Sequence, residues 1–191
     1  MGDPKKARKK YSRPRSPWRA DQLAQELYLL GNFGLRNKRE LWKAETQLSS
    51  VRKQARMLLA ATEQVRMREE KKLLDSLRRR GLIAEEATLD DILSLTVEDV
   101  LSRRLQTMVF KKGMAVSPLH SRQLIVHGHV VLGDRTITVP GYGVKRDEEG
   151  SIKLVGLKEP GPETQVPDTA PQAQSPTEAP ASAPVPQERQ N

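Results

Sequence analysis

The most informative pattern in this chain lies in residues 96–139, with the sequence TVEDVLSRRLQTMVFKKGMAVSPLHSRQLIVHGHVVLGDRTITV. Thr96 and Asp99 have the spacing of a capping box, which is typical of the first turn of a helix. Apolar residues then recur at helical intervals as far as Met108, and Gly113 follows where a helix would end. The pattern predicts one helix from Thr96 to Gly113 with a buried apolar stripe.

A second helix and a hairpin are predicted in the rest of this stretch. Ser117 followed by Pro118 is typical of the N-cap and first residue of a helix, and Gly128 is placed to end it. Gly133 and Asp134 then separate two short β-branched runs, which is the spacing of a tight hairpin. The stretch therefore predicts a compact module of helix, turn, helix and β-hairpin.

The polar side chains of the two predicted helices are expected to form one surface. Arg103 and Arg122 lie opposite the apolar stripes, as do Gln106 and Thr107, whereas Arg104 lies at the edge of its stripe. Because Arg103 and Arg122 belong to neither stripe, we expect their replacement to change thermal stability little. A serine at a helix N-terminus leaves free N–H groups nearby that favour an anion. For any single surface arginine, simple solvation is the commoner role. The expected basic surface of the module comprises Arg103, Arg104, Lys111, Lys112, Ser117, Arg122 and Gln123.

Residues 103–142 resemble the RNA-binding module of the small-subunit ribosomal protein S4 family. The features that agree, in order, are an Arg-Arg-Leu-Gln helix, a glycine turn, a serine before the second helix, Arg-Gln-Leu-Ile, His-Gly-His, the hairpin and Pro-x-Tyr. The departures are Ser121, the Gly-Asp turn and Gly141, none of which removes a basic residue. The resemblance covers roughly residues 2–155 and is strongest to the archaeal and eukaryotic branch.

This resemblance implies a structural constituent of the small ribosomal subunit. It implies a primary binder of small-subunit ribosomal RNA, which nucleates assembly of the subunit body and supports translational accuracy. It also implies contact with neighbouring small-subunit ribosomal proteins, notably the S5 family, on cytoplasmic ribosomes. A free-standing RNA-binding chaperone or stress factor that uses the same module is the alternative.

The histidines are expected to contact RNA or to pack, and not to bind a metal. Two histidines at i and i+2 do not share one helix face, and neither cysteines nor acidic residues accompany them. We therefore add His127 and His129 to the predicted RNA contacts. The acid pairs are adjacent in sequence, and no nucleophile elbow or phosphate-binding glycine loop occurs. The sequence thus predicts no enzyme, no cofactor and no small-molecule substrate.

The charge distribution favours a polyanionic partner. The 191 residues carry 33 Lys and Arg against 24 Asp and Glu, a net charge of +9. Residues 1–156 hold 31 basic and 19 acidic side chains, whereas residues 157–191 hold 2 and 5. Nucleic acid fits this balance better than a membrane, since neither a long apolar amphipathic helix nor a lipidation motif occurs. The charged N-terminus and the lack of an 18-residue apolar run predict neither signal peptide nor membrane span.

The first 19 residues are expected to form a basic N-terminal arm. They contain eight basic side chains, one acid and prolines at positions 4, 14 and 17, which prevent a continuous helix. One interpretation is a solvated, disordered tail; the other is a segment that becomes ordered on phosphate, with aromatics that stack on bases or pack on the body. The resemblance favours the second, with contacts from Lys5, Lys6, Arg8, Lys9, Lys10, Arg13 and Arg15.

Residues 20–95 are predicted to form a helical domain. The first helix has Leu23, Leu27 and Leu30 as its expected buried stripe and Gly31 as its expected stop. The spacing indicates helices over residues 20–31, 37–59, 66–80 and 88–95.

The second of these helices has six cations on its polar side, namely Lys38, Arg39, Lys43, Arg52, Lys53 and Arg56. They form either a solvated face or a row of phosphate contacts, and the resemblance favours the phosphate contacts. The predicted contacts on this helix are Lys38, Arg39, Arg52, Lys53 and Arg56.

The predicted fold class is α+β and mainly α: a helical lobe plus a small RNA-binding module of two helices and a β-hairpin, with a disordered basic arm and a disordered Pro-rich tail. After the hairpin, Val144–Arg146 and Ile152–Leu154 are expected to pair across an acidic turn. The tail holds eight of the thirteen prolines and few large apolar residues, so it has no core to bury. The expected domains are residues 1–19, 20–95, 96–156 and 157–191.

Overall fold

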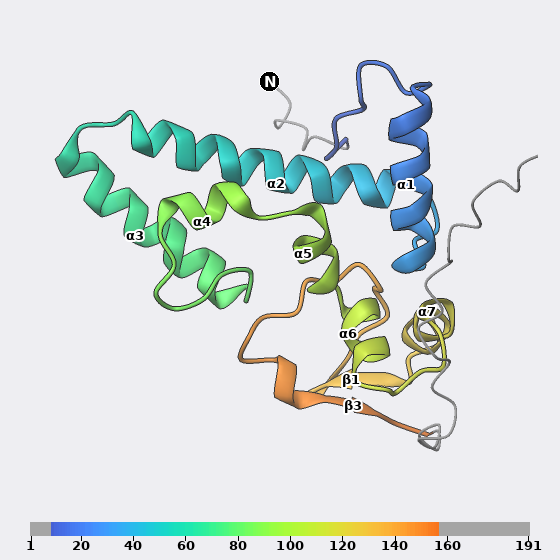
Figure 1. The fold of residues 1–191 in the computed structure, drawn as a ribbon. Coiled ribbons are helices and arrows are strands. Elements are labelled where there is room, and N and C mark those ends of the chain that lie inside the picture. Colours follow the sequence, from blue (N-terminus) through green and yellow to red (C-terminus); the bar gives the residue numbers. More distant parts are fainter. Residues whose placement is uncertain (1–8, 157–191) are drawn as a thin grey trace, which may run out of the picture.

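The computed structural model describes residues 9–156, which form a helical lobe from α1 to α5 and a module in which α6 and α7 lie against a small sheet (Figure 1). This arrangement confirms the predicted fold class. Residues 1–8 and 157–191 lie outside the described residues, and so do the predicted tail and the predicted contacts of Lys5, Lys6 and Arg8. Within the described part, no helix combines the length and the apolar character needed to cross a membrane. The elements are α1 Ala20–Asn32, α2 Lys38–Leu59, α3 Glu63–Arg79, α4 Leu89–Ser94, α5 Val97–Ser102, α6 Leu105–Lys111, α7 Pro118–Val126, β1 Val130–Leu132, β2 Arg135–Thr136, the 3₁₀ helix η1 Glu149–Ser151 and β3 Ile152–Leu154.

The helical lobe is built around α2, with α1 across its first turns and α3 and α4 beneath it (Figure 1). The side chain of Asn37 accepts the N–H of Glu40 at 3.3 Å and caps the start of α2. Capping boxes open α4 and α5 in the same way. These caps confirm the predicted helix starts. The apolar core shared by α2, α3 and α4 comprises Leu48, Val51, Ala55, Leu74, Leu77, Leu89, Ile92 and Leu95.

The buried face of α1 differs from the predicted one. Leu27 is 62% exposed, and the buried side chain of this helix is Glu26. The carboxylate of Glu26 accepts the indole N–H of Trp42 at 3.1 Å and lies 2.8 Å from the Nζ atom of Lys38. Because these partners on α2 replace water around the carboxylate, α1 can turn a polar side chain toward α2. The helix also continues past Gly31, so the predicted stop is wrong as well.

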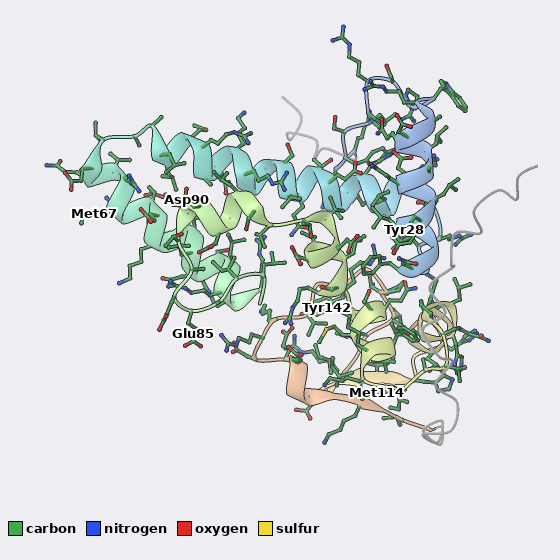
Figure 2. The ribbon with its side chains drawn as sticks, in the orientation of Figure 1. Tyr28, Met67, Glu85, Asp90, Met114 and Tyr142 are labelled. Carbon is green, nitrogen blue, oxygen red and sulfur yellow. The ribbon has the colours of Figure 1, made fainter. Side chains whose placement is uncertain are left out.

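The single helix predicted in residues 96–113 is broken into α5 and α6 at Arg103 and Arg104. The N–H of Leu105 donates to the carbonyl of Tyr142 at 2.7 Å, so the backbone at the start of α6 is bonded to a distant loop. Figure 2 shows Tyr142 beside this break. The prediction is wrong because a loop that comes after the hairpin supplies backbone partners that helical periodicity does not reveal.

The sheet has the order β2-β1-β3 and is antiparallel throughout. Two residues connect β1 and β2, as predicted, and Gly133 adopts a φ of 61° in this turn. The predicted pairing of Val144–Arg146 with β3 is wrong, since β3 pairs with β1. Val144 is instead buried, and its N–H donates to the carbonyl of Arg103 at 2.9 Å.

The core between α6, α7 and the sheet includes a buried amide. Gln106 and Thr107 are both buried, so the prediction that they face solvent is wrong. The amide nitrogen of Gln106 donates to the carbonyls of Gly34 and Pro118, both at 2.8 Å. Its oxygen accepts from the Nε atom of Arg122 at 3.2 Å. One side chain of α6 thereby joins the turn between α1 and α2 to two residues of α7, Pro118 and Arg122. The apolar part of this core comprises Leu105, Met108, Val109, Ala115, Leu124, Ile125, Val130, Leu132, Val144 and Ile152.

Replacing Gln106 with Met is expected to destabilise the fold by about 2–4 kcal/mol. Methionine keeps a similar volume but removes the partners of two carbonyls and of Arg122, and each unsatisfied buried group costs about 1–3 kcal/mol. Urea unfolding followed by circular dichroism measures the change. The matched control is Gln123→Met on the exposed side of α7, with an expected change within about 0.5 kcal/mol. Equal stability of the two variants would contradict the structural role of the buried amide.

Candidate nucleic-acid interface

A basic trough runs between the helical lobe and the module. It consists of a cleft of about 600 Å³ between the lobes and an adjoining hollow of about 440 Å³ along α2. Lys43, Gln47 and Arg80 line both, so the two are continuous. We call this surface the interlobe trough. Its polar lining comprises Lys10, Glu40, Lys43, Thr46, Gln47, Ser50, Gln54, Arg80, Arg103, Arg104 and Lys145.

The interlobe trough is positively charged. Lys10, Lys43 and Arg80 are exposed and form no ion pair within residues 9–156. Lys145 is also exposed and comes from the module. Of the described residues that line the trough, Glu40 alone is acidic, and its charge is balanced by two arginines. A surface of this kind attracts a polyanion such as the phosphate backbone of a nucleic acid.

Glu40 joins the two lobes on one side of the cleft. Its Oε2 atom lies 2.9 Å from Nη2 of Arg104 and 2.6 Å from Nη2 of Arg122. The side chains of Glu40, Arg104 and Arg122 are only 21%, 12% and 17% exposed. Burial raises the pKa of Glu40, but the hydrogen bond from Arg122 and the charges of both arginines outweigh burial, so this pKa lies below its ordinary value. We call these three residues the Glu40 cluster.

Arg103 joins the lobes on the other side of the cleft. Its Nε donates to the carbonyl of Arg80 at 3.2 Å, and its Nη1 lies 3.0 Å from the carboxylate of Glu149. Gly81, which follows the end of α3 as predicted, adopts a φ of 67°. A Cβ atom at Gly81 would lie 2.6 Å from the Arg103 guanidinium. The left-handed backbone therefore favours glycine here, and a side chain at this position would displace the Arg103 guanidinium.

The three arginines of the predicted module surface are not simply solvated. Arg103, Arg104 and Arg122 are largely buried and are bonded to the helical lobe. The expectation that Arg103 and Arg122 are simply exposed is wrong, because their partners lie far away in the sequence. The expected small contribution of these two residues to stability stays a prediction. Contact between their remaining N–H groups and RNA stays a prediction.

The other predicted RNA contacts fall into two groups. Lys38 pairs with a carboxylate of α1, whereas Arg52 and Lys112 donate to backbone carbonyls. The hydroxyl of Ser117 accepts the N–H of His120 at 3.1 Å, which confirms the predicted N-cap of α7. The members of the second group keep exposed side chains, and they are Lys9, Lys10, Arg13, Arg15, Arg39, Lys53, Arg56, Lys111, Gln123 and His127.

The described part of the N-terminal arm lies along α2. Tyr11 stacks on Trp42, with their ring centroids 6.0 Å apart and an angle of 28° between the rings. The Nζ atom of Lys9 lies over the Tyr11 ring, 5.6 Å from its centroid. Lys10 lines the hollow beside α2. The stack therefore holds the arm at one end of the interlobe trough.

The histidines gather around α7. His120, His127 and His129 line a shallow hollow of about 320 Å³. Nδ1 of His129 lies 3.3 Å from the carbonyl oxygen of Val155. Residues 9–156 contain no group of three or more potential ligand side chains placed to hold a metal ion. RNA contact by His127 and His129 stays a prediction.

Three cations of the trough are absent from the predicted contact residues. Helical periodicity did place Lys43 on the cationic side of α2, and the structure puts it in the cleft. Arg80 ends a run of arginines, but the helix dipole explains cations there without RNA. Lys145 lies in a loop without helical or strand periodicity, and only the folded structure brings it to the cleft.

The packing of α6 and α7 on a small sheet beside a basic trough defines the chain as an S4-domain protein. A family model described as S4 domain matches residues 103–149, which lie in this module. A second model, described as Ribosomal protein S4/S9 N-terminal domain, matches residues 5–117, more than half of the chain. The chain belongs to the ribosomal protein S4 family, which confirms the resemblance.

Three relatives, each named small ribosomal subunit protein uS4, resemble the chain over most of its length. The protein of Ignicoccus hospitalis is 53% identical over 162 residues, which are 85% of this chain and 96% of that protein. The protein of Hyperthermus butylicus is 56% identical over 152 residues, which are 80% of this chain and 86% of the relative. The protein of Nitrosopumilus maritimus is 46% identical over 185 residues, which are 97% of this chain and 88% of the relative. The similarity therefore extends over both lobes.

The Glu40 cluster predicts a specific loss of stability in acid. Because the pKa of Glu40 is lower in the folded protein than in the unfolded chain, the unfolded state binds more protons as the pH falls. The stabilisation is complete above the unfolded pKa of about 4.3 and is lost as the pH falls through the folded value. We therefore expect the free energy of unfolding of Glu40→Gln to depend less on pH, between about 5 and 3, than that of the wild type.

Urea unfolding at a series of pH values measures this difference. The pKa of Glu26 is also below its ordinary value and stays unchanged by the substitution, so the variant should retain part of the acid sensitivity. Parallel stability curves for the two proteins would contradict the role of Glu40.

Proposed function

We propose that this protein is a structural constituent of the small ribosomal subunit and binds the ribosomal RNA of that subunit. The observation that supports the proposal best is the interlobe trough, to which both lobes contribute exposed cations while the one lining acid is balanced by arginines. Family membership supports the choice of partner, since each relative is named a small ribosomal subunit protein.

In the proposed complex the RNA backbone lies along α2 and enters the cleft, where Lys43, Arg80 and Lys145 bind phosphates. Such contacts set the position and orientation of the RNA without reading its bases. RNA helices present shape, phosphates and 2′-hydroxyl groups, so selectivity comes from the fit of a helix junction between the two lobes. Further exposed cations that extend the contact are Lys10, Arg13, Arg15, Arg39, Lys53, Arg56 and Lys111.

The proposal includes the role of the protein within the subunit. A protein that holds a junction of RNA helices between two lobes is suited to bind early and to nucleate assembly of the subunit body. We place it on cytoplasmic ribosomes beside neighbouring small-subunit proteins, notably the S5 family, where it supports translational accuracy. Its role is structural and not catalytic. Membership of the ribosomal protein S4 family supports a structural role in the small subunit. The points on assembly, on the S5 family and on accuracy rest on the resemblance.

Co-sedimentation tests the ribosomal role. A structural constituent is expected to stay with the small subunit through a high-salt wash, whereas salt releases a protein held only by screened surface charges. A free-standing RNA chaperone or stress factor with the same module is expected to dissociate. Release of most of the protein from the subunit would favour this alternative.

Loss of any one trough cation is expected to lower the salt dependence of binding to transcribed small-subunit ribosomal RNA. The three variants are Lys43→Ala, Arg80→Ala and Lys145→Ala. Loss of one phosphate contact reduces the slope of log K against log salt by about 1. Filter binding between about 50 and 200 mM salt measures the slope. The matched control is Lys153→Ala, which removes an exposed cation of β3 outside the trough. A slope that falls in the control and in none of the trough variants would place the RNA on another face.

A further inference from the structure

One carboxylate holds two separate segments of the module against the helical lobe. Glu40 lies in the first turn of α2, directly after the cap formed by Asn37. Arg104 lies at the break between α5 and α6, and Arg122 lies on α7. The two arginines reach the same oxygen of Glu40, at 2.9 and 2.6 Å, across 64 and 82 residues of sequence. The cluster therefore depends on how the lobes are oriented, and it constrains that orientation.

The Glu40 cluster lies beside the trough cations of both lobes. Glu40 and Lys43 are three residues apart on α2, so they are neighbours on one helix face, and both line the cleft. The backbone of Arg104 forms a bridge with Gly143, two residues before Lys145. A displacement of the Arg104 backbone relative to α2 would therefore also move Gly143 and the loop that carries Lys145.

The geometry of Arg122 shows how the cluster is held in place. The Nε atom of Arg122 donates to the buried side-chain oxygen of Gln106, and this bond orients the guanidinium toward Glu40. Further bonds join the lobes: Nε of Arg103 donates to the carbonyl of Arg80, the N–H of Arg146 donates to the carbonyl of Arg79, and the amide of Gln106 donates to the carbonyl of Gly34. Attachments on both sides of a cleft limit rotation as well as opening, and loss of the Glu40 cluster removes the ion pairs on one of these sides.

We infer that the Glu40 cluster is a positioning clamp that holds the two walls of the interlobe trough at the separation that RNA requires. This inference rests on the proposed RNA-binding function. The carboxylate of Glu40 repels phosphate, so its charge opposes RNA binding and only its geometric effect favours it. Removal of this charge therefore changes RNA affinity in opposite directions for a passive acid and for a clamp. If Glu40 is only a passive acid, Glu40→Gln raises RNA affinity; if it is a clamp, Glu40→Gln lowers RNA affinity.

The reason for a lower affinity is loss of preorganisation. Without the clamp, the free protein samples several lobe orientations, and only some of them are competent to bind. If the competent fraction falls to about one tenth, the apparent Kd rises about tenfold. The bound state still contacts the same phosphates, so the slope of log K against log salt stays unchanged.

The first test compares the binding of the full chain and two variants to transcribed small-subunit ribosomal RNA. We expect Glu40→Gln to raise the Kd about tenfold without a change in salt slope. The matched control is Glu98→Gln, which removes an exposed acid of α5 outside the cluster and the trough lining and should leave the Kd unchanged or lower. A Kd of Glu40→Gln equal to or below that of the wild type overturns the clamp.

The second test measures lobe orientation, which a merely weaker fold does not change. The chain contains no cysteine, so Lys71→Cys on α3 and Lys153→Cys on β3 provide a unique pair of spin-label sites. Pulsed electron paramagnetic resonance is expected to give a narrow distance distribution in the otherwise native protein, a broad one with Glu40→Gln and a narrow one again after RNA is added. A distribution that stays narrow with Glu40→Gln overturns the clamp even if affinity falls.

These measurements also separate failure of the clamp from failure of the proposed function. If the wild type does not bind the RNA, the proposed function fails, while the distributions of the RNA-free proteins still test the clamp. If Glu40→Gln melts below the assay temperature, Arg122→Gln replaces it, since this variant keeps the pair between Arg104 and Glu40. That variant is assessed by the width of the distribution alone, and a native width overturns the clamp.

Discussion

The ion pairs of Glu40 with Arg104 and Arg122 are the constraint on which the arrangement of the two lobes depends. Each lobe has its own apolar core, and a smaller apolar cluster around Leu101 and Leu41 lies where α5 meets α2. Beyond that cluster, the cleft between the lobes is crossed by charged and polar contacts. Apolar burial stabilises each lobe, whereas directional bonds set the angle between them. A polar junction also suits the proposed binding of a charged partner in the cleft.

The break between α5 and α6 makes this junction possible. In a continuous helix, Arg103 and Arg104 would both extend from one rod, with directions set by the helical twist. The loop around Tyr142 bonds to the first turn of α6 and interrupts the helix, so Arg103 reaches Glu149 while Arg104 reaches Glu40. Guanidinium groups suit this role because they remain charged when buried and donate to several acceptors at fixed angles. A local irregularity thus provides an attachment on each side of the cleft.

Features that depend on neighbours in the sequence could be predicted well. The caps at Asn37, Thr96 and Ser117 and the tight turn at Gly133 each involve residues within a few positions of one another, and all are present. Features that depend on distant partners were predicted poorly. The burial of Glu26 required Lys38 and Trp42 on the next helix, and the pairing of β3 with β1 required the loop at Val144 to be engaged elsewhere. The same difference holds for the candidate interface. Helical periodicity predicts the exposed cations of α2, but it does not predict that Lys145 lies at the cleft.

The sequence determined the starts of the helices, the hairpin, the basic character of the body and the resemblance to an RNA-binding family, because each is encoded by composition or by residues close together in the chain. Only the tertiary structure decided which cations are available to a ligand. Periodicity shows that Arg122 lies opposite an apolar stripe, but it does not show what faces that side of the helix in space. A long arginine side chain can reach a carboxylate of another lobe, and the distance between Arg122 and Glu40 is small only after the chain has folded.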